Sequence, residues 1–177
     1  ASGFEASVCE QYSIYWEDQM RLGGHIFGDA ADPSAWVAEH RRAGFSAAYC
    51  PIDEHQADSL VRDYERAAID ADLVIAEVGA WCNPLSPNEE NRSKAIAYCQ
   101  ARLALADAIG ARCCVNIAGS VGEENGRRAP HPESLTPAHF DLIVESVRTI
   151  IDGVKPKRTF YALEMMPWLY PDTVESY

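Results

Sequence analysis

Short apolar runs alternate with longer amphipathic segments along this chain. Runs rich in β-branched and aromatic residues predict strands, and apolar residues spaced three and four apart predict helices. The predicted strands are residues 24–28, 45–50, 73–78, 112–118 and 160–165. The predicted helices are residues 33–43, about 55–71, about 91–109 and a segment from Pro137 to beyond Ile151. This alternation is typical of repeated βαβ units that build a parallel sheet.

Capping residues support several of these helix boundaries. Asp32 and Thr136 each place a side-chain acceptor directly before a proline that suits the first helical turn. Gly44 follows the first helix, where glycine commonly ends a helix. A further helix is predicted to begin around residues 171–173.

Five βα units fit two architectures, an open doubly wound sheet and a (β/α)₈ barrel of which about five units are present. A full barrel takes about 250 residues, whereas this chain has 177. No GxGxxG or GxxxxGK[ST] loop opens any helix, which argues against an open-sheet nucleotide binder. On the pattern of strands and helices alone, the barrel and the doubly wound sheet are equally well supported. In either case we expect residues 1–177 to form a single domain.

Charge and hydrophobicity argue against some classes of binding partner, and the cysteine pattern indicates the cellular compartment. The net charge of −12 argues against nucleic acid, whose phosphates need clustered Lys and Arg. No apolar run approaches the length of a membrane span, so we expect no membrane partner. The six cysteines show no CxxC spacing, and the adjacent pair Cys113 and Cys114 resists ordinary bridging geometry. Together these observations predict a reducing compartment, the cytoplasm.

Candidate functional residues follow from position alone, because in both architectures they gather at the carboxyl ends of strands and in the next loops. His25 is either a ligand or substrate contact or a structural histidine, and Trp81 and Trp168 either wall a pocket or cap the rim. The residues at these positions are His25, Asp29, Asp53, Glu54, Trp81, Asn83, Asn116, Ser120, Glu164 and Trp168.

Glu164 is the sharpest candidate, because it ends an otherwise apolar strand. Strand alternation places it on the same side as Phe160 and Ala162. A charge there must be paired, hydrogen-bonded or bound to metal. Glu164 therefore either binds a metal or substrate or forms a salt bridge inside the barrel. Glu77, of opposite parity to its apolar neighbours, is predicted to pair across to a helix.

The remaining histidines give little sign of a metal site. His40 and His55 are predicted to lie on helix surfaces, His131 in a solvated loop, and His139 on the exposed side of its helix. None of them has the spacing of a closed zinc site.

Three segments carry a resemblance to a known family: residues 76–84, 110–116 and 161–168. They resemble the xylose isomerase-like sugar phosphate isomerase/epimerase superfamily, and the similarity extends over most of residues 23–177. The resemblance implies a (β/α)₈ barrel with one divalent ion at its mouth, Mn²⁺ or Mg²⁺, with Zn²⁺ or Co²⁺ as alternatives. The family's ligands are a Glu after strand five, then Asp, His and Glu after strands six to eight. Glu164 matches the first, and the others are expected beyond Tyr177.

The implied chemistry is proton abstraction next to a sugar carbonyl, assisted by the metal as a Lewis acid. Glu164 would be both metal ligand and catalytic residue, with substrate contacts from His25, Trp81, Asn116 and Trp168. Ketose 3-epimerases of this superfamily carry a second Glu where Tyr170 stands here, which argues against that activity.

The sequence thus predicts a metal-dependent isomerase or epimerase, or a related lyase or dehydratase, acting on a small sugar-like carbonyl compound. The alternative is a non-catalytic sugar- or metabolite-binding barrel that has lost its metal. A homo-oligomer is left open.

Overall fold

The computed structural model describes residues 20–28, 32–122 and 130–176. In this part of the chain, the strands of a parallel sheet lie in sequence order: β1 (Ala47–Tyr49), β2 (Val74–Gly79), β3 (Cys113–Asn116) and β4 (Phe160–Leu163). The helices are α2 (Pro33–Ala43), α3 (Asp58–Asp70), α4 (Glu89–Ile109), α5 (Pro137–Val154) and the short 3₁₀ helix η2 (Val174–Ser176).

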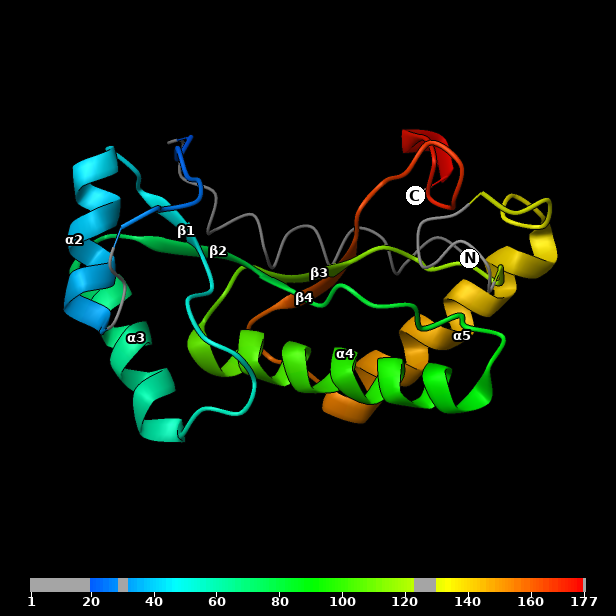
Figure 1. Ribbon diagram of the computed structural model, residues 1–177, viewed down its shortest axis with the longest axis horizontal. Helices are drawn as coiled ribbons and strands as arrows, with labels where there is room; N and C mark the ends of the chain where they lie inside the picture. The colour runs from blue at the N-terminus through cyan, green and yellow to red at the C-terminus, as the bar shows by residue number, and fades with distance from the viewer. Residues whose placement is uncertain (1–19, 29–31, 123–129, 177) are drawn as a thin grey trace, which may run out of the picture.

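The strand order shows which of the two architectures the chain adopts. Each strand pairs with its sequence neighbour through a helical crossover, and the order never reverses. A doubly wound sheet needs such a reversal, whereas successive strands of a (β/α)₈ barrel advance in one direction. Figure 1 shows α4 and α5 side by side against one face of the sheet. The described chain is therefore an arc of a barrel.

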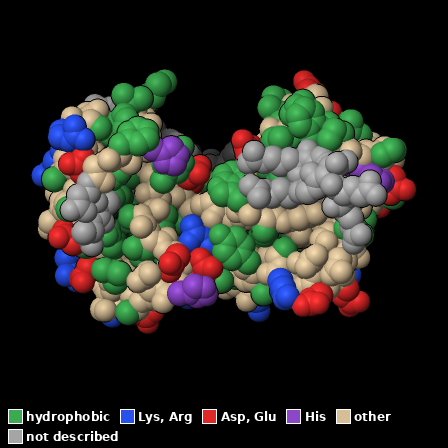
Figure 2. Space-filling model, in the orientation of Figure 1, with side chains coloured by type: hydrophobic (Ala, Val, Ile, Leu, Met, Phe, Trp, Pro, Cys, Tyr) green, Lys and Arg blue, Asp and Glu red, His purple; other side chains and the backbone are tan. Residues whose placement is uncertain are grey.

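The molecule is hollowed between two lobes in the space-filling view, with acidic and histidine side chains near the hollow (Figure 2). None of the described helices has both the length and the apolar composition needed to span a membrane.

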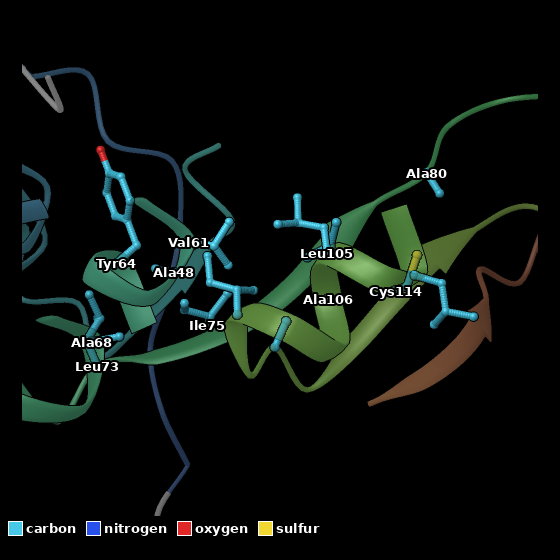
Figure 3. Packing of buried hydrophobic residues seen from close by; sticks show 14 of the residues in the cluster. Ala48, Val61, Tyr64, Ala68, Leu73, Ile75, Ala80, Leu105, Ala106 and Cys114 are labelled. Carbon is cyan, nitrogen blue, oxygen red and sulfur yellow. The ribbon is translucent and has the colours of Figure 1, made fainter. Parts of the chain in front are cut away.

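The main core lies between the sheet and the helices α2, α3 and α4 (Figure 3). From the sheet, Ile75, Val78 and Cys114 point into it, and α4 contributes Leu103 and Ala106. Because side chains alternate along a strand, burying these residues on the helical side turns their neighbours to the other side. We call that other side of the sheet, turned away from α4, the open face.

The predicted helix caps are confirmed. The Asp32 carboxylate accepts a hydrogen bond from the Ala35 backbone N–H at 2.9 Å. The Thr136 hydroxyl accepts one from the His139 N–H at 3.3 Å. Gly44 ends α2 with φ of 73°, a left-handed conformation that glycine adopts without steric cost.

Two predicted elements differ from the structure. Residues 24–28 form no strand, although Gly23 makes an isolated parallel bridge to Ala47 of β1. The two consecutive glycines at 23 and 24 offer no side chains to pack, which weakens strand pairing there. The helix predicted from residues 171–173 is reduced to the single 3₁₀ turn of η2.

Two histidine predictions were wrong. His40 and His139 are each only 2% exposed, not on the surface of their helices. The Nδ1 atom of His40 lies 2.8 Å from the Trp36 carbonyl oxygen, and its ring contacts the Trp36 ring edge-on. Because a hydrogen bond within its own helix satisfies the ring, His40 can pack as a core residue. His55 is exposed, as predicted.

Candidate active site

The open face of the sheet carries polar side chains, positioned by the strand register. Glu77 of β2 lies opposite Cys113 of β3, and buried Val78 lies opposite buried Cys114. The pairing of β1 with β2 shifts between Ala48 and Tyr49, so that Tyr49 also lies opposite Glu77. Such an irregularity re-aims the side chains that follow it. Glu77 and Tyr49 therefore share the open face at the carboxyl ends of their strands.

A cavity of about 650 Å³ lies at this end of β1 and β2. The His25 ring stacks on the Tyr49 ring there, with their centroids 4.4 Å apart. A cavity of this size, with aromatic walls and a few polar groups, is typical of small-molecule sites. Its lining residues are His25, Tyr49, Cys50, Asp53, Glu54, His55, Glu77, Gly79, Trp81, Tyr98 and Arg102.

Arg102 of α4 joins the two loops that border the cavity. Its Nε donates to the Gly79 carbonyl at 2.8 Å, and its Nη1 donates to the Ile52 carbonyl at 3.3 Å. The same Nη1 lies 3.2 Å from the Glu54 carboxylate, and both side chains are only 11% exposed. The guanidinium thus fixes the loop after β1 and the end of β2 relative to each other.

The prediction that Glu77 pairs across to a helix was wrong, because Glu77 lines the cavity on the open face. It forms no salt bridge with any residue in the described ranges. Burial raises the pKa of Glu77, and the negative charge of Glu164 raises it further, while His25 lowers it. The pKa of a carboxyl group in this setting is shifted toward the range useful for proton transfer.

Glu164 also belongs to the open face. Its backbone N–H donates to the Asn116 carbonyl at 2.7 Å, which continues the pairing of β4 with β3. Tyr161 turns the other way, toward Cys99 of α4, so alternation turns Ala162 and Glu164 away from the helices. The Glu164 side chain is exposed, and no Lys or Arg of the described residues forms a salt bridge with it.

The structure brings His25, Trp81 and Glu164 together around Glu77. His25 and Trp81 line the cavity, and Glu164 acts on Glu77 through its charge. A side chain at Gly79 would collide with the Trp81 indole, so glycine is needed for this close approach. Trp168 is 39% exposed in the loop after β4 and does not line the cavity.

Of the other candidates, Asp53 and Glu54 also line the cavity, and the rest lie elsewhere or outside the described part. The Asn83 side chain links two loops, donating to the Ser120 carbonyl at 2.8 Å and accepting from its N–H at 3.0 Å. These bonds hold the loops after β2 and β3 together. Asp29 lies outside the described residues.

Asn116, expected to contact substrate, is fully buried between the sheet and α4. Its carboxamide oxygen accepts from the Cys82 N–H at 3.3 Å. Its amide nitrogen donates to the Tyr161 hydroxyl at 3.3 Å and to the Cys99 sulfur at 3.5 Å. Because these contacts are all internal, the geometry assigns Asn116 to holding the rim rather than to lining the cavity.

We therefore expect Asn116→Ala to lower the free energy of unfolding by about 2 kcal/mol, since it removes a fully buried side chain and leaves the Cys82 N–H without this acceptor. Urea denaturation followed by circular dichroism measures this change. Asn91→Ala, at an exposed position of α4, is the matched control and should stay within about 0.5 kcal/mol of the parent protein. Unchanged stability together with weakened ligand binding would instead place Asn116 in the binding site.

The described residues contain no complete metal site. No three His, Cys, Asp or Glu side chains among them lie close enough together to hold an ion. Glu77 and Glu164 nevertheless bring two carboxylates into one electrostatic environment. A divalent cation would relieve the repulsion between them, and carboxylate oxygen suits Mg²⁺ or Mn²⁺. The two carboxylates thus have the chemistry that such an ion prefers, but they are too few to hold it by themselves.

Solved structures of other proteins share this fold. The chain matches a candidate xylose isomerase from Rhodospirillum rubrum over 89% of its own length and 59% of the other chain, at 15% identity and a TM-score of 0.66. It matches 3-keto-D-glucoside 4-epimerase from E. coli over 84% and 56%, at 14% identity and a TM-score of 0.60. It matches a xylose isomerase-like TIM barrel protein from Mycobacterium smegmatis, in complex with magnesium, over 86% and 53%, at 21% identity and a TM-score of 0.52.

The chain shares the TIM-barrel fold of these structures and forms an arc of that barrel. It spans a little over half the length of each of these three proteins. No sequence-family profile matches it, and no curated protein matches it significantly. The barrel architecture expected from the sequence is thereby confirmed.

Proposed function

We propose that this chain belongs to a divalent-metal-dependent isomerase or epimerase that acts on a sugar or sugar-like carbonyl compound. The observation that carries the proposal is the pair of carboxylates, Glu77 and Glu164, on the open face at the carboxyl ends of β2 and β4. In a (β/α)₈ barrel this end of the strands is where active sites form. The cavity of about 650 Å³ beside Glu77 has room for a monosaccharide.

Four side chains at this end of the sheet have different roles in the proposal. Glu164, exposed and free of a described salt bridge, would hold the cation, with Glu77 as a second oxygen donor or as the group that moves a proton. The cation, when bound, would supply Lewis-acid polarisation of the sugar carbonyl. The half-buried Glu77, whose pKa is raised by burial, suits proton transfer at the adjacent carbon. His25 and Trp81 would orient the sugar, the first by hydrogen bonding and the second through its flat apolar face.

Similarity of fold supports the class of substrate. The structures that share this fold include a 3-keto-D-glucoside 4-epimerase and an L-ribulose 3-epimerase. Both names describe an epimerase, which inverts the configuration at one carbon of a sugar. We extend this class of reaction, and not either individual substrate, to the present chain.

The test is the incorporation of solvent deuterium into sugars that are incubated with the intact protein in heavy water. Mass spectrometry of the sugars measures this incorporation. A panel of aldoses, ketoses and keto-glycosides would be incubated with protein as purified, after chelation, and after return of Mn²⁺ or Mg²⁺. We expect chelation to slow exchange at least about 100-fold, because Lewis-acid stabilisation contributes several kcal/mol to such reactions. Returning the metal should restore the rate.

Two results would contradict the proposal. Exchange that continues unchanged after chelation would rule out metal dependence. Sugar binding without any exchange, with metal supplied, would indicate a non-catalytic binding barrel instead.

A further inference from the structure

Two cysteines far apart in sequence meet behind the rim of the cavity. Cys82 lies in the loop that leaves β2, and Cys99 lies in α4. Their sulfur atoms are 3.2 Å apart, and both side chains are in the thiol form. A disulfide has a sulfur–sulfur length of about 2.05 Å, so a movement of about 1 Å would bring these atoms to bonding distance.

The surroundings of Cys99 favour its thiolate form. The Tyr161 hydroxyl donates to the Cys99 sulfur at 3.4 Å, and the Asn116 amide donates to it at 3.5 Å. The hydrogen bond from Cys82 lowers the pKa of the Cys99 thiol most, and those from Tyr161 and Asn116 lower it further, against the opposing effect of burial. Because the thiolate is the nucleophile in sulfur chemistry, these donors prepare Cys99 to attack a neighbouring sulfur.

Cys114 shows what burial does without such donors. It is as fully buried as Cys99, and burial raises the pKa of its thiol to about 12. The partly buried Cys50 and Cys113 also have raised pKa values, with burial as the main cause. The chemical setting of Cys99 is therefore a property of this cluster and not of depth alone.

We propose that Cys82 and Cys99 form a peroxide-sensitive dithiol–disulfide pair. Cys82 is partly exposed, whereas Cys99 is fully buried, so a hydroperoxide meets Cys82 first. One oxygen atom passes to the Cys82 sulfur, which becomes a sulfenic acid, and the hydroperoxide leaves as an alcohol, or as water when it is hydrogen peroxide. The Cys99 thiolate then attacks the Cys82 sulfur, the S–S bond forms, and the departing hydroxide takes a proton to become water.

The step balances as two thiols and one hydroperoxide giving one disulfide, one alcohol and one water. The Cys82–Cys99 bond would tie the loop that carries Trp81 to α4. Such reversible pairs are the kind of disulfide found in reducing compartments, where structural disulfides are rare. This reaction needs neither metal nor sugar, so it can succeed or fail independently of the proposed isomerase activity.

The test is peptide mapping of the intact protein after oxidation. Fully reduced protein would be freed of reductant, treated with a modest excess of hydrogen peroxide, quenched in acid and alkylated after unfolding. We expect Cys82 and Cys99 to escape alkylation together and to appear in one cross-linked peptide. Dithiothreitol should return both to the alkylated pool.

Variants separate this pair from the other cysteines. Cys82→Ser should abolish the cross-link and leave Cys99 open to alkylation, whereas the matched control Cys113→Ser, also partly buried, should form the cross-link as the parent does. Because the map of the parent protein decides the outcome by itself, a variant that fails to fold does not weaken the test. The proposal is overturned by the absence of the cross-link, by a bridge between other cysteines, or by a sulfinic acid at Cys82 in its place.

Discussion

Replacing Arg102 with methionine is expected to lower the free energy of unfolding by about 3–5 kcal/mol, the cost of removing one partner from a buried ion pair. The Glu54 carboxylate, 11% exposed, would lose its partner at 3.2 Å. The Gly79 carbonyl would also lose its Nε donor, and the Ile52 carbonyl its Nη1 donor. Methionine keeps the length and the apolar stem of the side chain, so the loss reports mainly on charge and hydrogen bonding.

Urea denaturation followed by circular dichroism measures this loss. The matched control is Arg66→Met, because Arg66 forms an exposed pair with Asp63 at 3.8 Å, and it should cost less than about 1 kcal/mol. Adding Glu54→Gln to Arg102→Met should recover part of the stability, since it removes a buried charge that has lost its arginine partner. Equal effects of Arg102→Met and Arg66→Met would show that Arg102 does not join the two loops as described.

Glu164→Gln is expected to reduce kcat/KM for solvent-hydrogen exchange by about a thousandfold, because a lost metal ligand removes several kcal/mol of transition-state stabilisation. Glutamine keeps the size of the side chain but lacks the charge that would hold the cation. Glu164 is exposed, so its replacement should leave the stability of the protein nearly unchanged. The loss should therefore appear in activity and not in folding.

Glu145→Gln is the matched control for this variant, since Glu145 is an exposed carboxylate of α5. It should keep the full rate of exchange measured under the same conditions. A Glu164→Gln protein that exchanges as fast as Glu145→Gln would show that the carboxylate at the end of β4 has no catalytic part.

Local sequence signals were sufficient for most of the fold. The apolar periodicity of α5 and the cap at Asp32 depend on residues within a few turns of each other, so they can be read from sequence alone. The side of the sheet that Glu164 occupies also followed from simple alternation along β4. The strand predicted at residues 24–28 does not form, because the contact with β1 is an isolated bridge at Gly23 and the glycines there offer no side chains to pack.

The parts of the site that sequence missed depend on contacts between distant residues. Glu77 was assigned to the wrong side because its neighbour Val78 is buried against the helices and not in the barrel interior, which alternation alone cannot show. Arg102 reaches Glu54 across 48 residues, and Cys82 reaches Cys99 across 17. Asn116 was correctly placed at a strand end, but only its partners reveal that it faces α4. The partners of a polar residue that lie far away in the sequence cannot be predicted from the residues next to it.

The central claim is that Glu164, supported by Glu77, holds a divalent cation at the open face of the sheet. Titration of Mn²⁺ into the chelated intact protein, followed by the loss of the free-ion electron paramagnetic resonance signal, tests this claim most directly. The account predicts one bound ion for the parent protein and for Glu145→Gln. It predicts affinity at least about 100-fold weaker for Glu164→Gln, because loss of a residue that only supports a metal ligand already weakens affinity by about 10–100-fold. Equal Mn²⁺ affinity in Glu164→Gln and the parent protein would contradict it.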